Sequence, residues 1–525
     1  MTPPFGRVLV ANRGEIALRV IRACHELGME AVAVYSDADA SAAHVRAADR
    51  AVRLGPPPAA ESYLLIDEVV AAALSAGAEA VHPGYGFLSE REAFARAVEE
   101  AGLVWVGPPP AVIAALGDKL AARRIAREAD VPHVPGTLEP ATVDGPDQVA
   151  AVLAAGREVG FPLLVKAAAG GGGRGMRRVV SADELVLALL AGSREAASAF
   201  GDGSVYLERE ILPARHIEVQ LLGDAAGSVV AIGERDCSMQ RRHQKLIEEA
   251  PAPGLGETER RRLHAMAVRM GSAAGLRNAA TCEFLYDRDG AFWFLEVNTR
   301  LQVEHPVTEL VAGLDIVVEQ FHLAAGRPLS ARALAAAEQA ARPASHAIEL
   351  RISAEDPARL FAPAPGLVTR WQMPSGPGIR VDTAVEAGDR IPSEYDPLIA
   401  KLIAHAEDRP AAIARLRRAV AEAEVGGIQT TLPFHRAMLD EPGFVDASEL
   451  ATTWVDAHWD GPRARAAAVR AAALAAGLAA LAGDRQDGQG AAPSDAGTTG
   501  QPGGDGSAPE WRMGGRALSM DRWPG

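Results

Sequence analysis

The sequence predicts an α/β and α+β protein that begins with a doubly wound parallel sheet and continues into mixed α+β domains. The chain has 525 residues, too many for one ordinary core and enough for about three domains. Its N-terminal part alternates short β-rich runs with helical stretches, which is the pattern of a doubly wound sheet. Strands joined by tight glycine turns follow, and the C-terminal part again mixes strands with helices.

The N-terminal elements alternate as a parallel sheet requires. Strands are expected at 7–12, 30–36, 78–84 and 103–108, with a helix at 14–27 and further helices between the later strands. Asp37 and Asp39 follow the second strand, roughly where a dinucleotide-binding fold places its ribose acid. The turn at 12–15 reads Asn-Arg-Gly-Glu and not Gly-x-Gly-x-x-Gly, so the sequence disfavours NAD binding.

Composition and turn signals place the boundaries of the later regions. Domains are expected at 1–118, 119–326 and 327–460, a lid subdomain at about 135–206, an Ala-rich helix at 461–482 and a flexible tail at 483–525. Strands are expected at 161–168, 205–210 and 214–223 in the second domain and at 346–353, 366–372 and 378–385 in the third, before a helix at 409–423.

A hairpin is predicted within residues 281–306. Asp289-Gly290 tolerates the positive φ angles of a type I′ turn, and with these two residues as the loop Arg288 faces Ala291. Because side chains alternate between the faces of a strand, this register decides which residues of the two strands meet.

Two acids meet across the predicted hairpin. In this register Glu283 lies directly opposite Glu296. Facing carboxylates destabilise a ladder by roughly 0.2–1 kcal/mol, and a hard divalent cation such as Mg²⁺ removes that penalty. The same face continues with Asn298 and Arg300 and, if the extended trace persists, with Gln302 and Glu304.

The alternative to an active-site wall is a solvated edge strand with scattered charges. The intervening positions are mostly apolar and suit burial of the opposite face: Phe292, Leu295, Val297, Leu301 and Val303. A hairpin register, two facing acids and an in-phase series of polar groups coincide here, so the sequence favours the active-site wall.

Two loops are expected to border a ligand site, and the first of them favours a ligand that carries phosphate. The glycine-rich loop at 169–177 follows Lys166 without the order of a Walker P-loop. Consecutive glycines let backbone N–H groups approach phosphate oxygens and permit a hinge. A mobile lid flanked by Lys166 and Arg174 is therefore favoured over a disordered surface turn. The segment HPGYGFLSE at 82–90 forms a loop at the carboxyl edge of the first sheet, where ligands bind in such folds.

Basic residues gather in one segment of this acidic chain. Residues 235–245 include Arg235, Arg241, Arg242, His243 and Lys245, which suits either a solvated face or a triphosphate or bicarbonate pocket. The 53 basic residues include only four lysines, namely Lys119, Lys166, Lys245 and Lys401. Because this chain uses Arg where Arg suffices, the lysines are candidates for phosphate contacts that need a compact ammonium group.

Charge and cysteine content exclude several classes of protein. A formal charge of −15 argues against a nucleic-acid-binding surface, although a small anion needs only a local cationic pocket. No signal peptide is recognisable, and no segment approaches the roughly 18 apolar residues of a membrane span. Cys24, Cys237 and Cys282 are odd in number and widely spaced, so we expect a reduced, cytoplasmic protein in which all three pack as small apolar residues.

Taken together, these segments resemble the biotin carboxylase family of ATP-grasp enzymes. The matching stretches, in order from residue 5 to about residue 457, are VANRGEIALRV, HPGYGFLSE, GDK, KAAAGGGGRGMR, ERDCSMQRRHQK, EEAPAP, EVNTRLQVEHPVTE and AEDP. Carbamoyl-phosphate synthetases and D-alanine ligases are also ATP-grasp enzymes, but HPGYGFLSE with QRRHQK and NTRLQVEHPVTE indicates biotin carboxylation. The resemblance implies an N-terminal biotin carboxylase domain, a central ATP-grasp domain with a mobile lid, and a C-terminal biotin carboxylase domain.

The resemblance also implies a role for individual residues. It implies ATP contacts at Lys119, Lys166, Gly172, Gly173, Glu208, His216, Gln240, His243, Glu283 and Glu296, and metal ligands at Glu283, Glu296 and Asn298. It implies a bicarbonate pocket at Lys245, Arg300, Gln302, Val303 and Glu304, and a biotin site at Tyr85, Arg300 and Arg351. The implied catalytic residues are Arg300, Glu304 and Lys245. Ala168 and Ala169 replace a Ser and a Gly common in relatives, which implies a slightly different lid flexibility.

The implied reaction has two steps. Bicarbonate, deprotonated by Glu304, attacks the γ-phosphate of ATP in the presence of two Mg²⁺ or Mn²⁺ ions, and the resulting carboxyphosphate delivers CO₂ to biotin. Arg300 stabilises the enolate of the biotin ureido group. No lysine lies in a Met-Lys-Met context, so biotin must arrive on a separate carrier protein or on a further domain. The implied partners are that carrier, a carboxyltransferase and a second copy of this chain.

Two other functions stay open at this point, together with the final carboxyl acceptor. The chain could be another ATP-grasp ligase that forms an acyl phosphate, or a non-catalytic nucleotide-binding subunit. Acetyl-CoA, propionyl-CoA, methylcrotonyl-CoA, pyruvate and urea are all possible acceptors, since the carboxyltransferase selects them. The sequence also leaves open whether the chain is truncated before carrier domains and what the segment at 461–525 does.

Overall fold

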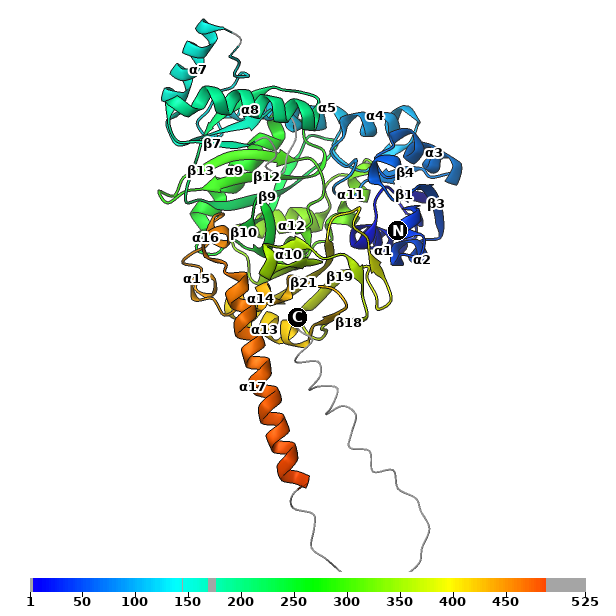
Figure 1. The fold of residues 1–525 in the computed structure, drawn as a ribbon. Helices are drawn as coiled ribbons and strands as arrows, with labels where there is room; N and C mark the ends of the chain where they lie inside the picture. Colours follow the sequence, from blue (N-terminus) through cyan, green and yellow to red (C-terminus); the bar gives the residue numbers. More distant parts are fainter. Residues whose placement is uncertain (1–2, 144, 169–175, 488–525) are drawn as a thin grey trace, which may run out of the picture.

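Three larger sheets organise the computed structural model, which describes residues 3–143, 145–168 and 176–487. Figure 1 shows the N-terminal sheet (blue) beside a long central sheet (green and yellow), with a smaller lobe at the top of the view. Residues 169–175 of the glycine loop, including Gly172 and Gly173, and residues 488–525 of the expected tail lie outside the described residues.

The N-terminal sheet is parallel, with strand order β3-β2-β1-β4-β5. Its strands are β1 (Arg7–Val10), β2 (Glu30–Ser36), β3 (Arg50–Gly55), β4 (Ala80–His82) and β5 (Val104–Trp105). Its helices are α1 (Gly14–Glu26), α2 (Ala43–Ala47), α3 (Ile66–Ala76), α4 (Glu92–Glu100) and α5 (Pro110–Gly117). Val8 and Val10 pack in one core and Leu9 in another, so both faces of the sheet are covered. The predicted doubly wound sheet is confirmed.

The smaller lobe contains an antiparallel three-stranded sheet with β6 in its centre. Its elements are α7 (Pro146–Val159), β6 (Leu163–Ala167), β7 (Arg177–Val179), α8 (Ala182–Phe200) and β8 (Val205–Arg209). Leu163 and Val165 on β6 are completely buried in the lobe's core with side chains of α7 and α8. Because side chains alternate along a strand, Lys166 projects from the opposite face of β6.

The central sheet has eight antiparallel strands in the order β13-β12-β9-β10-β11-β14-β21-β19. They are β9 (Arg215–Gly223), β10 (Val229–Arg241), β11 (Gln244–Ala250), β12 (Asn278–Tyr286), β13 (Phe292–Asn298), β14 (His346–Ser353), β19 (Ile379–Thr383) and β21 (Leu398–Ala406). Because β11 pairs with β14, this sheet runs without a break across the boundary expected at residue 326.

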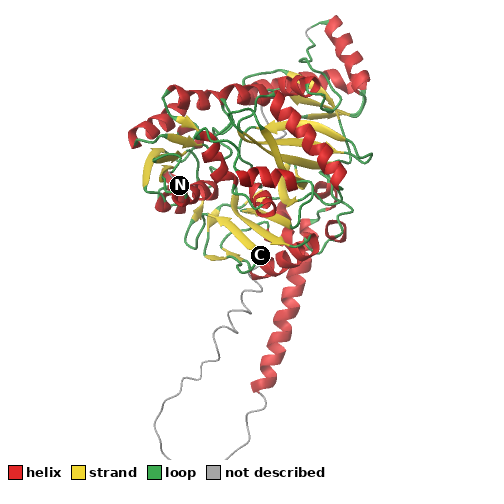
Figure 2. Cartoon of the chain, turned by 180° about the vertical axis from the view of Figure 1, so that it is seen from behind, coloured by secondary structure: helices red, strands yellow, loops and turns green. Residues whose placement is uncertain are grey.

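The remaining helices lie around the central sheet (Figure 2). They are α6 (Lys119–Glu128), α9 (Glu257–Ala273), α10 (His305–Ala312), α11 (Ile316–Ala324), α12 (Ala331–Gln339), α13 (Arg409–Glu422), α14 (Leu432–Met438), α15 (Pro442–Val445) and α16 (Trp454–His458). Leu402 on β21 packs in one core with Leu416 and Val420 on α13, so α13 covers the central sheet at β21.

One predicted strand of the C-terminal region is divided in two. The segment at 366–372 forms β17 (Gly366–Leu367) and β18 (Arg370–Gln372), which pair with β20 (Arg390–Ile391) and β22 (Glu424–Gly426) respectively. Between them the buried Val368 donates its N–H to Asp389, and Thr369 donates to Gly426. The chain therefore changes partner strand at these two residues, which an alternating pattern does not reveal. A third short pair joins β15 (Glu355–Asp356) to β16 (Ala362–Pro363).

The Ala-rich segment forms α17 (Gly461–Asp487), which points away from the rest of the chain in Figures 1 and 2. The helix expected at 461–482 is thus confirmed and is five residues longer at its C-terminal end. Among the described residues, no helix combines the length and the hydropathy needed to cross a bilayer.

Candidate active site

The predicted meeting of two acids across the β12–β13 hairpin is confirmed. Glu283 on β12 is the direct partner of Glu296 on β13, so both side chains project from the same face of the sheet. Asn298 pairs with Thr281 two positions further on and shares this face. The Asn298 amide donates a hydrogen bond to Glu283 Oε1 at 2.8 Å.

The turn of this hairpin is not the predicted type I′ turn. Asp287 N–H donates to the Ala291 carbonyl at 3.1 Å, so the loop holds three residues and not two. Asp287 Oδ1 accepts hydrogen bonds from the N–H groups of Asp289 (3.0 Å) and Ala291 (2.9 Å), which stabilises the longer loop. Within the loop only Gly290 has a positive φ angle, 79°. A bulge at Leu295 takes up the extra residue and restores the predicted register.

Cations offset the charge of the two facing acids. Glu283 accepts hydrogen bonds from His216 Nε2 at 2.9 Å and Lys245 Nζ at 3.2 Å, while Glu296 accepts one from Lys119 Nζ at 2.7 Å. Burial alone would raise the pKa of Glu283, but Lys245 and His216 hold it far below its usual value. Burial alone would lower the pKa of His216, and the Glu283 carboxylate raises it above the usual value.

The oxygen atoms on this face are suitable ligands for a hard divalent cation. Glu283 and Glu296 supply carboxylate oxygens and Asn298 supplies an amide oxygen, which are the ligands that Mg²⁺ prefers. The three predicted metal ligands therefore lie together on neighbouring strands.

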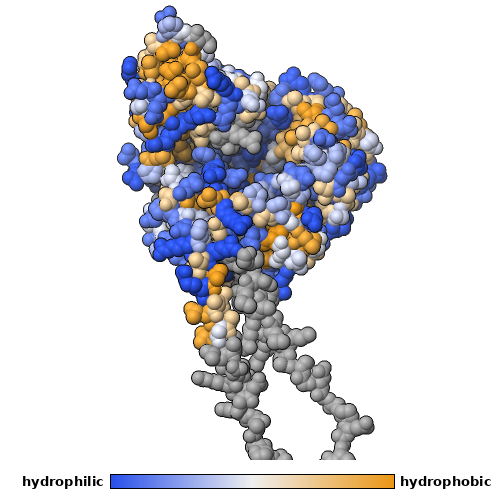
Figure 3. Space-filling model, in the orientation of Figure 1, coloured by the Kyte–Doolittle hydropathy of each residue, from blue (hydrophilic) through white to orange (hydrophobic). Residues whose placement is uncertain are grey.

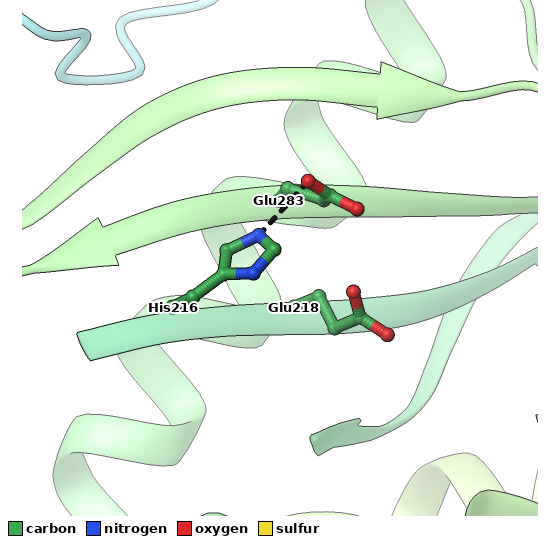
Figure 4. Close-up of side chains that lie close together, drawn as sticks. All are labelled: His216, Glu218 and Glu283. Carbon is green, nitrogen blue, oxygen red and sulfur yellow. Dashed lines mark hydrogen bonds and ion pairs between the residues drawn. The ribbon is translucent and has the colours of Figure 1, made fainter. Parts of the chain in front are cut away.

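Glu218 is a site residue that the sequence reasoning missed. Figure 4 shows Glu218 next to His216 on β9, with Glu283 on the neighbouring strand β12. Ligand atoms of these three residues lie within 4.8 Å of one another. Glu218 is completely buried and accepts hydrogen bonds from Arg235 Nε and Lys245 Nζ, both at 2.5 Å. The available signal was the His-x-Glu spacing, which places both side chains on one face of a strand.

The predicted continuation of the strand through Glu304 is wrong. Strand β13 ends at Asn298, and Glu304 occupies the N-cap position of α10, with φ −82° and ψ 10°. Pro306 in the first helical turn favours a helix start at this point. The polar side chains still converge, because Arg300 donates to Asn298 Oδ1 at 3.1 Å and to Gln302 Oε1 at 3.0 Å.

Glu304 is completely buried between two cations. Its Oε1 accepts a hydrogen bond from Lys245 Nζ at 2.6 Å, and its Oε2 accepts one from Arg351 Nη2 at 3.0 Å. Burial would raise the pKa of Glu304, but Lys245 and Arg351 lower it well below its usual value. Glu304 is therefore a carboxylate at neutral pH.

Cys237 also contacts Glu304. Its thiol donates to Glu304 Oε1 at 3.9 Å, and burial raises its pKa well above the usual value, so the sulfur stays protonated. A buried, protonated thiol with one weak S–H contact is compatible with the packing role predicted for Cys237. Cys24 and Cys282 lie in apolar cores, as predicted.

Arg300 links the hairpin to the N-terminal domain. Its Nε donates to Glu90 Oε2 at 2.8 Å. Burial alone would lower the pKa of Arg300, but Glu90 and other nearby acids raise it above the usual value. Glu90 closes the segment HPGYGFLSE and was missed as a site residue, although it belongs to a segment that the sequence singles out.

Tyr85 is linked to the backbone at Val303, next to Glu304, through a chain of contacts. The Asn12 amide donates to the Pro83 and Tyr85 carbonyls, both at 2.7 Å, and the Tyr85 hydroxyl donates to Glu15. Glu15 pairs with the buried Lys401 at 3.1 Å. Lys401 Nζ in turn donates to the Val303 carbonyl at 3.1 Å.

Of the described residues that the resemblance assigns to ATP, Lys166 and Glu208 lie on the sheet of the lobe, and His216, Gln240, Glu283 and Glu296 lie on the central sheet. Lys119 at the start of α6 contacts Glu296, and Lys166 on β6 contacts the buried Glu208, which also accepts from Arg123 Nη1 at 2.9 Å. Figure 3 shows this face of the molecule hollowed between the lobe and the N-terminal domain, with largely hydrophilic walls.

The remaining basic residues of residues 235–245 do not form one pocket. Arg235 is the buried ladder partner of Glu218 on the same face of the sheet, and the Arg241 guanidinium lies 4.9 Å from the Phe361 ring centroid. Arg242 and His243 form the β10–β11 turn with φ angles of 47° and 64°. Of the five basic residues in this segment, only Lys245 forms an ion pair with Glu304 in the described structure. Gln240 is buried on β10, where its amide donates to the Cys237 carbonyl at 3.4 Å.

Comparison with known proteins decides the family. The family model described as biotin carboxylase, N-terminal domain, matches residues 4–113, the one described as carbamoyl-phosphate synthase L chain, ATP binding domain, matches residues 118–332, and the biotin carboxylase C-terminal domain matches residues 349–457. The biotin carboxylase of Nostoc sp. is 46% identical over 453 residues, which are 86% of this chain and 98% of the relative. The chain belongs to the biotin carboxylase family.

Two further matches show the range of this family. The biotin-dependent acyl-coenzyme A carboxylase alpha3 subunit of Mycobacterium leprae is 47% identical over 459 residues, covering 87% of this chain and 75% of the relative. The biotin carboxylase domain dimer of Hydrogenobacter thermophilus 2-oxoglutarate carboxylase, solved with MgADP, ADP and bicarbonate, superimposes with a TM-score of 0.81 at 43% identity. That match covers 86% of this chain and 98% of the other. The fold is that of an ATP-grasp biotin carboxylase, and the chain is an ATP-grasp ligase.

Proposed function

We propose that this chain carboxylates biotin with bicarbonate at the expense of ATP, as the first half-reaction of a biotin-dependent carboxylase. The observation that supports this best is the buried Glu304 carboxylate held between Lys245 and Arg351, beside the facing acids of the hairpin. A protein that only binds nucleotide has no need for a buried base between two anion-binding cations. Another acyl-phosphate-forming ligase is disfavoured, because the relatives are biotin carboxylases and biotin-dependent carboxylase subunits.

Glu304 is the proposed base. As a carboxylate it can accept the proton of bicarbonate, whose remaining charge Lys245 and Arg300 would bind together with Gln302 and the backbone at Val303. The bicarbonate oxygen attacks the γ-phosphorus of ATP, the bond to the β,γ-bridging oxygen breaks, and carboxyphosphate and ADP form. Arg300 and Arg351 are proposed to stabilise charge on bicarbonate or on the biotin enolate, and Tyr85 is proposed to contact biotin.

Lys119 and Lys166 are proposed to bind ATP phosphates. Each ammonium contacts a carboxylate, Glu296 or Glu208, which fixes its position. His216, Gln240 and His243 are proposed as further ATP contacts on the central sheet, and Gly172 and Gly173 as lid residues.

Glu283, Glu296 and Asn298 are proposed to hold two divalent cations, Mg²⁺ or Mn²⁺. Such ions supply electrostatic stabilisation of the phosphoryl group that is transferred. Lys119 and His216 each donate a hydrogen bond to one of the two acids.

The proposed partners are a biotin carrier protein, a carboxyltransferase and a second copy of this chain. A dimer is recorded for the Hydrogenobacter thermophilus domain, which supports the last of these. Relatives of similar identity belong to acyl-CoA and 2-oxoglutarate carboxylases, which differ in the final carboxyl acceptor. The domain boundaries at 118 and 326 and the cytoplasmic location remain predictions.

The test is ADP release by the purified chain with ATP and Mg²⁺, with bicarbonate and free biotin added singly and together. The proposal predicts that turnover needs bicarbonate, that biotin accelerates it, and that labelled bicarbonate appears in carboxybiotin. A rate of ADP release that does not change when biotin is added would indicate another ligase. Normal ADP binding without any turnover would indicate a regulatory subunit.

A further inference from the structure

Two buried carboxyl groups face each other beside Arg351. Glu248 on β11 is the direct ladder partner of Glu349 on β14, and both residues are completely buried. Directly opposed residues of an antiparallel ladder have Cβ atoms about 4.5–5.5 Å apart, so their carboxyl groups can reach each other. The reaction described above uses neither group.

Three carboxyl oxygen atoms of this pair have no hydrogen-bond partner. Glu248 Oε1 accepts a hydrogen bond from Arg351 Nε, whereas Glu248 Oε2 and both oxygens of Glu349 are buried and have no partner. Ionised carboxylates only accept hydrogen bonds, so two of them cannot satisfy each other. A single proton turns Glu349 into a donor and gives Glu248 Oε2 a partner.

The surrounding charges are already engaged. The groups that face the pair are Lys245 on β11, Arg351 on β14, Lys401 on β21, Cys237 on β10 and Glu304 at the start of α10. Lys401 pairs with Glu15 at 3.1 Å, and Lys245 pairs with Glu218 and Glu304 at 2.5 and 2.6 Å. No cation of this group forms an ion pair with Glu349 in the described structure.

These surroundings favour the protonated form of one carboxyl group. Burial raises the pKa of Glu349 well above its usual value, although Lys401 opposes the effect. Burial also raises the pKa of Glu248 to about 7 against the opposing effect of Arg351. Two interacting acids lose their protons in steps that belong to the pair, so the first proton leaves readily and the second is retained.

We propose that Glu248 and Glu349 share one proton in the working enzyme and that this pair positions Arg351 against Glu304. Glu248 then presents one negative charge to Arg351 Nε, and the neutral Glu349 donates its O–H to Glu248 Oε2. Loss of the shared proton places a second charge beside Arg351, which competes with Glu304 for the guanidinium. The positioning role rests on the proposed function, whereas the shared proton does not.

The first test measures the proton directly in the full-length chain. Glu349→Gln keeps the size of the side chain and a donor toward Glu248, but it cannot hold a titratable proton. Infrared difference spectra between wild type and this variant at neutral pH should contain the C=O band of a buried, protonated carboxyl group. Raising the pH should remove the band. Spectra that lack this band would overturn the proposal.

The second test measures the positioning of Arg351. At pH 7 Glu349→Gln should retain kcat within about twofold, whereas Glu349→Leu, which has no donor, should lose about tenfold or more in kcat with little change in the KM for ATP. The ratio of Glu349→Gln to wild-type activity should rise with pH, by about tenfold per pH unit once the pair deprotonates. A ratio that stays constant with pH would overturn the positioning role, and so would equal loss in both variants.

These two readouts separate the inference from the function on which it rests. A wild-type chain that shows the infrared band but does not carboxylate biotin refutes the proposed function and leaves the shared proton intact. If Glu349→Leu does not fold, the spectra and the pH dependence of Glu349→Gln still decide the question.

Discussion

Glu296 faces Glu283 across the β12–β13 ladder, and each carboxylate has its own cations. Lys119 from α6 reaches Glu296, while His216 and Lys245 from the central sheet reach Glu283. The cations that contact the two acids therefore come from three elements, namely α6, β9 and β11.

Replacement of Glu296 should separate metal-dependent chemistry from nucleotide binding. Glu296→Gln keeps the hairpin register but removes one proposed metal ligand and the partner of Lys119. We expect turnover to fall by about a hundredfold or more and to require more Mg²⁺, because the charge on the transferring phosphoryl group loses its stabilisation. ATP turnover against Mg²⁺ concentration checks this. Asp289→Asn, at the exposed tip of the same hairpin, should behave as wild type; an unaltered Mg²⁺ dependence in Glu296→Gln would contradict the metal proposal.

A pair of glycine variants tests the positioning of Tyr85. Gly84 has φ 63°, and a Cβ atom there would lie 3.0 Å from Asn12 Nδ2, the group that holds the Tyr85 carbonyl. Gly86 has a similar φ of 67° with no atom within 4 Å of a Cβ, so it is a matched control for backbone strain. We expect Gly84→Ala to raise the KM for free biotin more than Gly86→Ala does, with ADP affinity unchanged in both. Equal KM values in the two variants would show that Asn12 does not position Tyr85.

Glu249 should make stability depend on acid pH. It is buried and accepts hydrogen bonds from His346 Nε2 (2.8 Å) and Arg409 Nε (2.6 Å). Burial would raise its pKa, but these partners lower it to about 2 from 4.5. A depressed pKa stabilises the fold above the unfolded value, and this contribution of about 3 kcal/mol is lost as the pH falls from 4.5 toward 2.

The check is urea unfolding of wild type and Glu249→Gln at several pH values. The variant should be less stable by a constant amount from pH 5 to pH 7, and the difference should shrink below about pH 4.5. Glu338→Gln, an exposed site on α12, should show no such difference. A stability difference that is independent of pH below 4.5 would contradict the assignment.

Removal of the C-terminal segment should leave catalysis intact. Helix α17 points away from the site, and the Trp459 indole, which donates to the Pro357 carbonyl at 2.9 Å, precedes it. A chain that ends at Asp460 keeps this contact and should carboxylate free biotin at the wild-type rate. Initial rates and thermal midpoints check this, and a large loss of rate at an unchanged midpoint would assign a catalytic role to residues 461–525.

The sequence predicted local periodic features well. Strand β14 and the N-terminal strands follow from apolar runs, and the facing of Glu283 and Glu296 follows from strand alternation. The turn type was wrong because Asp287 stabilises a longer loop, and the bulge at Leu295 compensates for it. Neither effect is visible in a hydrophobic pattern.

Long-range contacts could not be predicted from one sequence. Glu218 and Arg235 are 17 positions apart and Glu248 and Arg351 are 103 positions apart, yet each pair is joined by a buried ion pair. The sheet that unites β11 with β14 creates the second contact, and no local pattern records that pairing. All four lysines are largely buried, the most exposed having 19% of its side chain accessible. Three of them form ion pairs with acids of the site, whereas Lys401 donates a hydrogen bond to the Val303 carbonyl.

Replacement of Glu304 tests the central claim most directly. Glu304→Gln keeps the shape of the side chain but cannot take the proton of bicarbonate. Isothermal titration should show ADP binding within about twofold of wild type, which confirms folding, while bicarbonate-dependent ATP cleavage should fall by about 10²–10⁴-fold. Wild-type cleavage by this variant would contradict the assignment of Glu304 as the base.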